Sequence, residues 1–186
     1  MVLLNLSQPL TATQIAKRTQ MARDHVSDVL RELSIYKLCC CCNPESVRGR
    51  VFTLTKLGRK CRERLLKKYK LTELPCHTGK VDCSLLGWAV FRHRASVIKI
   101  LDRPMRAVTA RKLAISRDSE LRMSSNNARD ILKLIVKNGI AKAVEERKQA
   151  RPIYELTDAG RQLQMLLYQA DTPGYTTEQI FGESVA

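Results

Sequence analysis

The strongest constraint on this chain is an internal repeat. Displaced by 102 residues, the stretch that begins at Val26 aligns without a gap with the stretch that begins at Ala128. Units of solenoid proteins are about 20–50 residues long, so this longer period predicts two copies of one small domain. The aligned pairs include Asp28 with Asp130, Leu30 with Leu132, Leu54 with Leu156, Thr55 with Thr157, Gly58 with Gly160 and Arg59 with Arg161.

The repeat divides the 186 residues into four parts. We expect a first domain at residues 1–70, a linker at 71–83, a second domain at 84–169 and a C-terminal tail at 170–186. The length fits two small domains. The hydrophobic content of 44% is that of an ordinary globular chain, which allows each copy a modest core.

Both copies carry excess positive charge. The chain has a net charge of +15, with 33 Lys and Arg against 18 Asp and Glu. Residues 1–70 contribute +10 and residues 84–170 contribute +9, whereas 71–83 and 171–186 are slightly acidic. The basic character therefore belongs to the repeated domains, and it favours a polyanionic partner, nucleic acid first.

The second copy predicts helices followed by a β-hairpin and a final helix. Its third helix is the clearest, because apolar residues recur at helical spacing from Ala128 to Val136 and Gly139 provides a stop. Thr157 stands where an N-cap belongs. In order, we expect a long helix over 84–101, a helix from about Thr109, a loop over 116–122, a helix from about Ser124 to Asn138, strands at 140–144 and 153–156, and a last helix from Thr157.

The first copy repeats this order with a stunted beginning. Only a few apolar residues precede Pro9, so most of the first helix is missing and an apolar face should need another cover. We expect the 84–101 helix to supply it. The remaining elements are expected as helices at 11–19 and 21–33, strands at 38–42 and 51–54, and a helix capped by Thr55 that runs to about Lys70.

The two copies share the pattern Leu-Thr-x-x-Gly-Arg at Leu54–Arg59 and Leu156–Arg161. Together with the helix–turn–helix and the basic hairpin tip, it resembles the winged helix-turn-helix domains of MarR-like and ArsR-like transcriptional regulators, over residues 2–70 and 84–169. The resemblance implies a mainly α fold with small β-hairpins (α+β), built from two tandem winged helices. The chain departs from the pattern in its short first helix and in a longer loop before Met123, which we count as four extra residues.

The resemblance implies that the third helix of each copy, about 20–33 and 123–138, enters the major groove and that the hairpin wings contact the DNA backbone. Arg23 suits guanine, because a guanidinium bonds its O6 and N7 together, and Asn126 or Asn127 suits adenine. The candidate DNA-binding residues are Gln20, Arg23, Asp24, His25, Ser27 and Arg31 in the first helix; Arg122, Ser124, Ser125, Asn126, Asn127, Arg129 and Lys133 in the second; and Arg48, Arg50, Arg147, Lys148 and Arg151 in the wings.

The expected function is that of a DNA-binding transcriptional regulator rather than an enzyme. The partner is double-stranded DNA, bound by a monomer acting as a pseudo-dimer or by a homodimer. Because the two third helices differ in sequence, a monomer should recognise an asymmetric site. Two alternatives stay open: a tandem winged-helix interaction module of a chromosome-segregation or transcription complex, and a plasmid-type replication initiator.

Other signals point away from cofactors, metals and membranes. Cys39 to Cys42 overlay a strand of the second copy, so we expect small half-buried strand residues. The spacing of Cys76, His77 and Cys83 is not that of a zinc site, and we expect no metal and no cofactor. With no apolar run of about 18 residues and clustered, odd cysteines, we expect a cytoplasmic protein. The tail should be mobile or an arm for a protein partner, anchored by Tyr175, Ile180 and Phe181.

Overall fold

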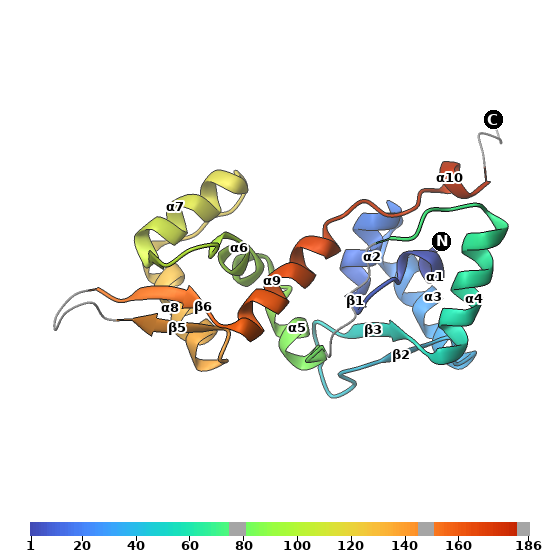
Figure 1. Cartoon of the computed structure of the whole chain (residues 1–186), viewed down its shortest axis with the longest axis horizontal. Helices are drawn as coiled ribbons and strands as arrows, with labels where there is room; N and C mark the ends of the chain where they lie inside the picture. The colour runs from blue at the N-terminus through green and yellow to red at the C-terminus, as the bar shows by residue number, and fades with distance from the viewer. Residues whose placement is uncertain (75–80, 145–150, 182–186) are drawn as a thin grey trace. The chain divides into compact units, whose positions relative to one another are not determined.

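The computed structural model describes residues 1–74, 81–144 and 151–181. The chain divides into a first unit, Met1–Gly87 with Gln169–Ala186, and a second unit, Trp88–Tyr168. Each unit combines helices with one small antiparallel sheet (Figure 1). The expected α+β class is therefore confirmed.

The first unit contains a three-stranded sheet in the order β1-β3-β2. Strand β1, which adds to the two predicted hairpin strands, was not predicted, because a strand of two residues is too short to show a hydrophobic period. The elements are α1 (Val2–Asn5), β1 (Leu10–Thr11), α2 (Ala12–Thr19), α3 (Arg23–Ile35), β2 (Cys39–Cys41), β3 (Val51–Leu54), α4 (Lys56–Lys68), α5 (Cys83–Ala89), whose last two residues belong to the second unit, and α10 (Thr177–Phe181).

The second unit has the same sheet order, β4-β6-β5. Its elements are α6 (Arg92–Ile100), β4 (Met105–Arg106), α7 (Ala107–Arg117), α8 (Ser125–Lys137), β5 (Ala141–Val144), β6 (Ile153–Leu156) and α9 (Asp158–Ala170), whose last two residues belong to the first unit.

The sheet registers show which residues correspond between the units. Thr11 pairs with Val51, and Arg106 pairs with Ile153, the residue 102 positions after Val51. Thr11 therefore corresponds to Arg106 rather than to Thr109. From these positions to the matched Met21 and Met123 there are 10 and 17 residues, so the second copy is longer by seven residues, not by four.

The shared Leu-Thr-x-x-Gly-Arg pattern has a structural cause. The Thr55 and Thr157 hydroxyls each accept a hydrogen bond, 3.1 Å long, from the amide of Gly58 and Gly160, as the predicted N-caps require. A Cβ atom on either glycine would lie 1.9 Å from the carbonyl oxygen of Leu38 or Ile140. The threonine starts the helix, and the glycine lets it pack closely against the residue that precedes the first strand of the hairpin.

The predicted helix over 84–101 is wrong. Two helices, α5 and α6, replace it, and Phe91 between them has an extended backbone. The Arg94 side chain folds back across the break: Nη1 donates to the Trp88 carbonyl at 2.9 Å, and the guanidinium lies 4.4 Å from the Trp88 ring centroid. This arrangement holds the turn that periodicity alone did not reveal. The cysteines of strand β2, in contrast, alternate as a half-buried strand is predicted to do: Cys39 is buried and Cys40 is exposed.

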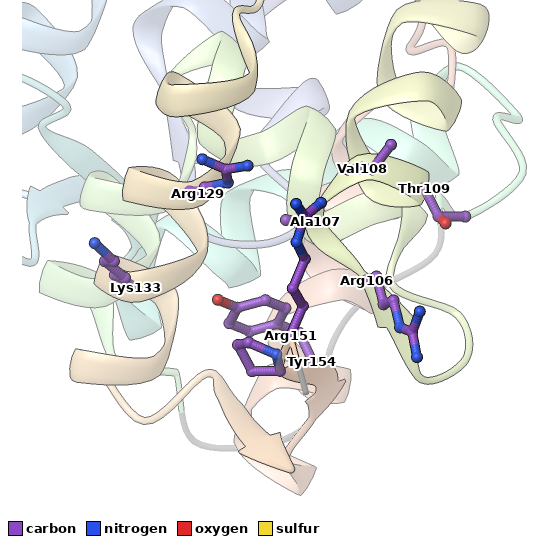
Figure 2. Close-up of a pocket in the computed structure, with 9 residues that line it drawn as sticks. Arg106, Ala107, Val108, Thr109, Arg129, Lys133, Arg151 and Tyr154 are labelled. Atoms are coloured by element: carbon purple, nitrogen blue, oxygen red, sulfur yellow. The ribbon is translucent and has the colours of Figure 1, made fainter. Parts of the chain in front are cut away.

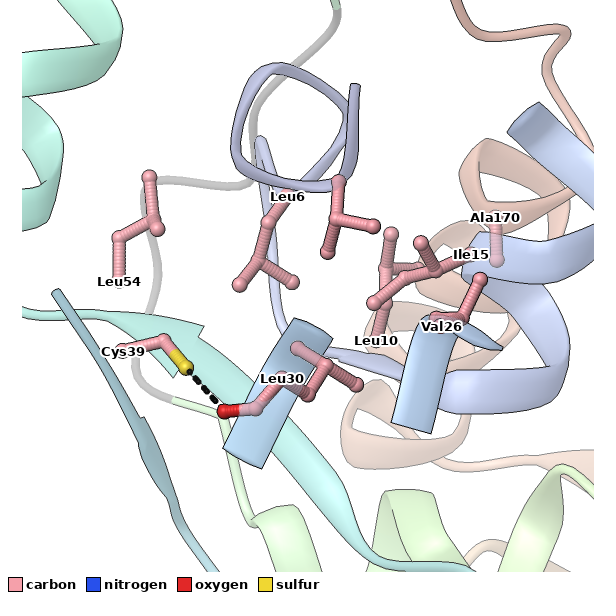
Figure 3. Close-up of a cluster of buried hydrophobic side chains, with 9 residues drawn as sticks. Leu6, Leu10, Ile15, Val26, Leu30, Cys39, Leu54 and Ala170 are labelled. Atoms are coloured by element: carbon pink, nitrogen blue, oxygen red, sulfur yellow. Dashed lines mark hydrogen bonds between the residues drawn. The ribbon is translucent and has the colours of Figure 1, made fainter. Parts of the chain in front are cut away.

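The core of the first unit includes a residue from the far end of the chain (Figure 3). Leu6, Leu10, Ile15, Val26 and Leu30 form its centre, and Ala170 packs with them. A second cluster joins Leu4 and Leu66 to Tyr175 and Ile180. The described part of the expected tail is thus neither a mobile tail nor a free arm. It covers the first unit, the role that we had expected of the 84–101 helix.

Hydrogen bonds fix this C-terminal segment. The Asn5 side-chain amide donates to the Tyr175 carbonyl at 3.1 Å, and its oxygen accepts from the Tyr175 amide at 2.8 Å. Arg18, 5% exposed, donates to the carbonyl oxygens of Asn5, Gln169 and Ala170. A buried cation without this set of carbonyl acceptors would be costly.

Replacing Asn5 with Ala should destabilise the first unit by about 3 kcal/mol, because the buried amide and carbonyl of Tyr175 both lose their partner. Chemical denaturation with hydrogen exchange at Tyr175 measures the effect. The control is Asn138→Ala, which removes an exposed side-chain bond to the Leu134 carbonyl and should cost much less. Equal losses would contradict the buried role of Asn5.

Lys37 and Gly139 allow a matched exchange. Both end a helix in the left-handed conformation, at φ 56° and 69°, and correspond across the repeat. A residue with a Cβ atom pays about 1 kcal/mol there. Lys37→Gly should therefore stabilise the first unit and Gly139→Lys should destabilise the second by about this amount, as hydrogen exchange resolved by unit would show. A change of the same sign in both variants would contradict the expectation.

Candidate nucleic-acid interface

Helix α8 separates a buried face from an exposed polar face. Ala128, Ile131, Leu132 and Ile135 are buried. The expected contact residues are all exposed: Arg122, Ser124, Ser125, Asn126, Asn127, Arg129 and Lys133. Ser124 also has a structural role, since its hydroxyl accepts from the Asn127 amide at 3.1 Å and caps the helix.

The segment leading into α8 is held by side chains of α6 and α7. Arg92 forms a fork with the Asp118 carboxylate at 2.8 and 2.6 Å, and Asp118 holds the pKa of Arg92 above its ordinary value. His93 Nε2 donates to the Arg122 carbonyl at 2.9 Å, and Arg111 Nε donates to the Met123 carbonyl at 2.7 Å. These contacts order the seven-residue extension and fix where α8 begins.

Helix α3 has the corresponding division. Val26 and Leu30 are buried. Ser27 is half-buried, and its hydroxyl donates to the Arg23 carbonyl at 2.9 Å, which reduces its availability to a ligand. Arg31 is exposed but forms an ion pair of 3.0 Å with Asp28. The other candidates are exposed: Gln20, Arg23, Asp24 and His25.

The hairpin loop of the first unit is organised by Asn43, which is 4% exposed. Its amide nitrogen donates to the Ser46 hydroxyl and the Gly49 carbonyl, each at 3.1 Å, and its oxygen accepts from the Val51 amide at 2.8 Å. Arg48 and Arg50 are exposed on this loop. The sequence did not single out Asn43, although Asn is a frequent organiser of turns.

In the second hairpin, Arg147 and Lys148 lie outside the described residues, as do Cys76 and His77 of the linker. Arg151 is described and exposed, and it borders a groove of about 610 Å³ (Figure 2). The groove joins the start of α7, the side of α8 and the strand β6. Its lining consists of Arg106, Ala107, Val108, Thr109, Arg129, Lys133, Arg151, Pro152 and Tyr154.

The groove combines candidates from the sequence with residues that sequence reasoning missed. Arg129, Lys133 and Arg151 had been singled out, whereas Arg106 and Tyr154 had not. Four of the described lining residues are cationic and none is a carboxylate. The pairing of β4 with β6 brings Arg106 to the groove, and so short a strand left no periodic signal.

Tyr154 is 6% exposed, and its hydroxyl is not among the buried side-chain atoms that lack a partner in the described part of the chain. Figure 2 shows this hydroxyl directed towards the side of the groove that Arg129 and Lys133 border. Burial raises the pKa of Tyr154, and the nearby Arg129 acts in the opposite direction. The hydroxyl is therefore a neutral donor at physiological pH, available to an acceptor in the groove.

Comparison of the chain with protein-family models, with curated proteins and with solved structures finds no match. Over the described ranges, no helix has both the length and the hydropathy that crossing a membrane requires. Nor do three or more His, Cys, Asp or Glu side chains gather as metal ligands within those ranges. The proposed function therefore rests on the geometry of the described residues.

Asn43→Ala should loosen the hairpin loop that carries Arg48 and Arg50, because three hydrogen bonds end on this one side chain. We expect a loss of about 2 kcal/mol and faster exchange of the Val51 amide, which is left without its acceptor. Amide exchange by NMR measures this directly. An unchanged Val51 amide would show that Asn43 does not organise the loop.

Proposed function

We propose that the protein is a DNA-binding transcriptional regulator built from two tandem winged helix-turn-helix domains. The observation that carries the proposal is the surface of the second unit, where an exposed polar face of α8 lies beside a groove bordered by four cationic side chains. A helix that offers hydrogen-bonding side chains next to concentrated positive charge suits a major groove flanked by phosphates.

The order of elements supports the winged-helix interpretation. In each unit two helices are followed by a hairpin and another helix, and a short strand before the first of them completes the sheet. In winged helices the second of these helices reads the major groove and the hairpin contacts the backbone. Helices α3 and α8 take the reading position here.

The contacts made within the protein divide the candidate residues by role. Asn126 and Asn127 are exposed at the first turn of α8, where an amide can bond the adenine edge. Arg23 occupies the first position of α3 and suits guanine. Arg129, Lys133 and Arg151 suit phosphates, whereas Ser124 and Ser27 are engaged in bonds to the backbone.

The charge of these surfaces favours nucleic acid over the interaction module. A module that only holds a protein partner has no need of arginine and lysine around its third helix. A replication initiator would use the same contacts, and the location of the bound sequence, at a promoter or at an origin, separates it from a regulator.

Binding to a short duplex should weaken steeply with salt, because each neutralised phosphate releases counterions. Arg129→Gln should reduce the slope of log K against log salt by about 1, the loss of one phosphate contact. Fluorescence anisotropy at several salt concentrations measures both. Arg64→Gln, an exposed charge on α4 away from the candidate surface, is the matched control and should leave the slope nearly unchanged.

Selection of bound duplexes from a random pool tests base reading. We expect enrichment of one asymmetric sequence, because α3 and α8 differ at their exposed positions. The variant Asn126→Ala with Asn127→Ala should relax preference over one half of that sequence. If no sequence is enriched, the regulator is contradicted and the protein-interaction module becomes the favoured function.

A further inference from the structure

We propose that the first unit binds an acidic, partly apolar segment of a partner protein at the surface where α3 ends and α4 begins. This surface, the junction patch, consists of three exposed apolar side chains and three neighbouring lysines: Ile35, Tyr36, Leu57, Lys37, Lys56 and Lys60. A protein partner at this surface goes beyond the proposed function, since none of the candidate DNA-binding residues belongs to the patch.

The apolar part of the junction patch is strongly exposed. Ile35 and Tyr36 are each 71% exposed, and Leu57 is 52% exposed. The fold brings them together, because the hydroxyl of Thr55, two residues before Leu57, donates to the Lys37 carbonyl at 2.6 Å. Single exposed apolar residues are common on protein surfaces, whereas a group rimmed by polar residues indicates an interaction site.

Lys37 occupies its position at a cost in stability. Helices α3 and α8 end in the same way, since the amides of Leu38 and Ile140 donate to a carbonyl of the last helical turn at 2.8 and 3.0 Å. This ending places the preceding residue in the left-handed conformation, which glycine adopts most easily. The second unit has Gly139 there, at φ 69°, but the first unit has Lys37, at φ 56°. A strained side chain where glycine would fit indicates a function.

The second unit has the same junction with a different surface. Thr157 and Gly160 repeat the contacts that Thr55 and Gly58 make in the first unit. The exposed positions of the patch are replaced as a group. In the order Ile35, Tyr36, Lys37, Lys56, Leu57 and Lys60, the second unit has Lys137, Asn138, Gly139, Asp158, Ala159 and Gln162. The fold therefore does not require the patch, because the same contacts form without it.

The charge around the apolar side chains defines the partner. Lys37, Lys56 and Lys60 are exposed, and none of them forms an ion pair with a described residue. The nearby carboxylates, Glu32 and Glu63, lie one turn away along their helices, at the edge of the patch. A nucleic acid would match the lysines and leave the apolar side chains in water. A protein segment with acidic and apolar side chains matches both.

The junction patch lies away from the start of α3, where the expected base contacts are. Arg23 begins and Ile35 ends this helix. Because an α-helix rises 1.5 Å per residue, about 18 Å separate the two positions. The loop of the hairpin also lies at the other end of β2 and β3 (Figure 1). The first unit can therefore hold a protein partner while the start of α3 stays accessible.

Selection on the full chain from a displayed pool of random peptides tests the patch. We expect enrichment of acidic peptides that also carry apolar side chains. Tyr36→Asn combined with Leu57→Ala introduces the residues of the second unit at two exposed positions. An enriched peptide should bind this variant about tenfold more weakly, measured by fluorescence anisotropy, because aromatic and apolar anchors carry much of such binding. Thermal unfolding should be unchanged. The control is Val47→Ala, which removes a 90% exposed side chain from the hairpin loop and should leave the affinity unchanged.

Lys37→Gly separates binding from stability. It should stabilise the first unit and still weaken the peptide several-fold, because a cation of the patch is lost, whereas a purely structural role would change stability alone. The patch is overturned if no peptide is enriched, if the enriched peptides lack excess acidic residues, or if Tyr36→Asn with Leu57→Ala binds them as tightly as the unaltered chain. Duplex binding should be the same in that variant. If the unaltered chain binds no duplex, only the proposed regulator is overturned.

Discussion

The structure depends on the junction where the returning strand of each hairpin becomes a helix. At this point the Thr55 and Thr157 hydroxyls accept from an amide of the new helix and donate to the carbonyl oxygens of Lys37 and Gly139, at 2.6 and 2.7 Å. One side chain thereby ties the end of the third helix to the start of the last. Because the hairpin lies between these two points, its register and the orientation of α3 or α8 follow from the same contact.

The helix caps and the hairpins on either side of this junction could be predicted from the sequence. The caps at Thr55 and Thr157, the paired strands and the buried face of α8 were all predicted from periodicity and a motif that recurs in register. Features that depend on distant or very short segments were missed. Two-residue strands have no period, the break at Phe91 rests on the fold-back of Arg94, and the docking of Tyr175 onto Asn5 joins residues 170 positions apart. No local pattern contains these contacts.

The candidate site shows the same division. Exposed polar positions on α3 and α8 follow from helical spacing, so residues such as Asn126 and Arg129 were accessible to sequence reasoning. Arg106 and Tyr154 were not, because β4 had to be placed before Arg106 reached the groove. A tyrosine at a strand position, where the other copy has Phe52, was the one signal in the sequence, and its place in the groove with Arg129 and Lys133 appears only in the structure.

The net charges of the two copies suggest a similarity that their accessible charges do not have. The two copies have nearly equal net charge, +10 over residues 1–70 and +9 over 84–170. In the first unit, however, Arg18 and Arg62 are each 5% exposed and donate to backbone carbonyls. These cations stabilise the fold and its C-terminal segment rather than face a ligand. In the second unit Arg129, Lys133 and Arg151 are exposed around one groove. A polyanion is attracted by accessible charge, so two units of nearly equal net charge can still bind it unequally.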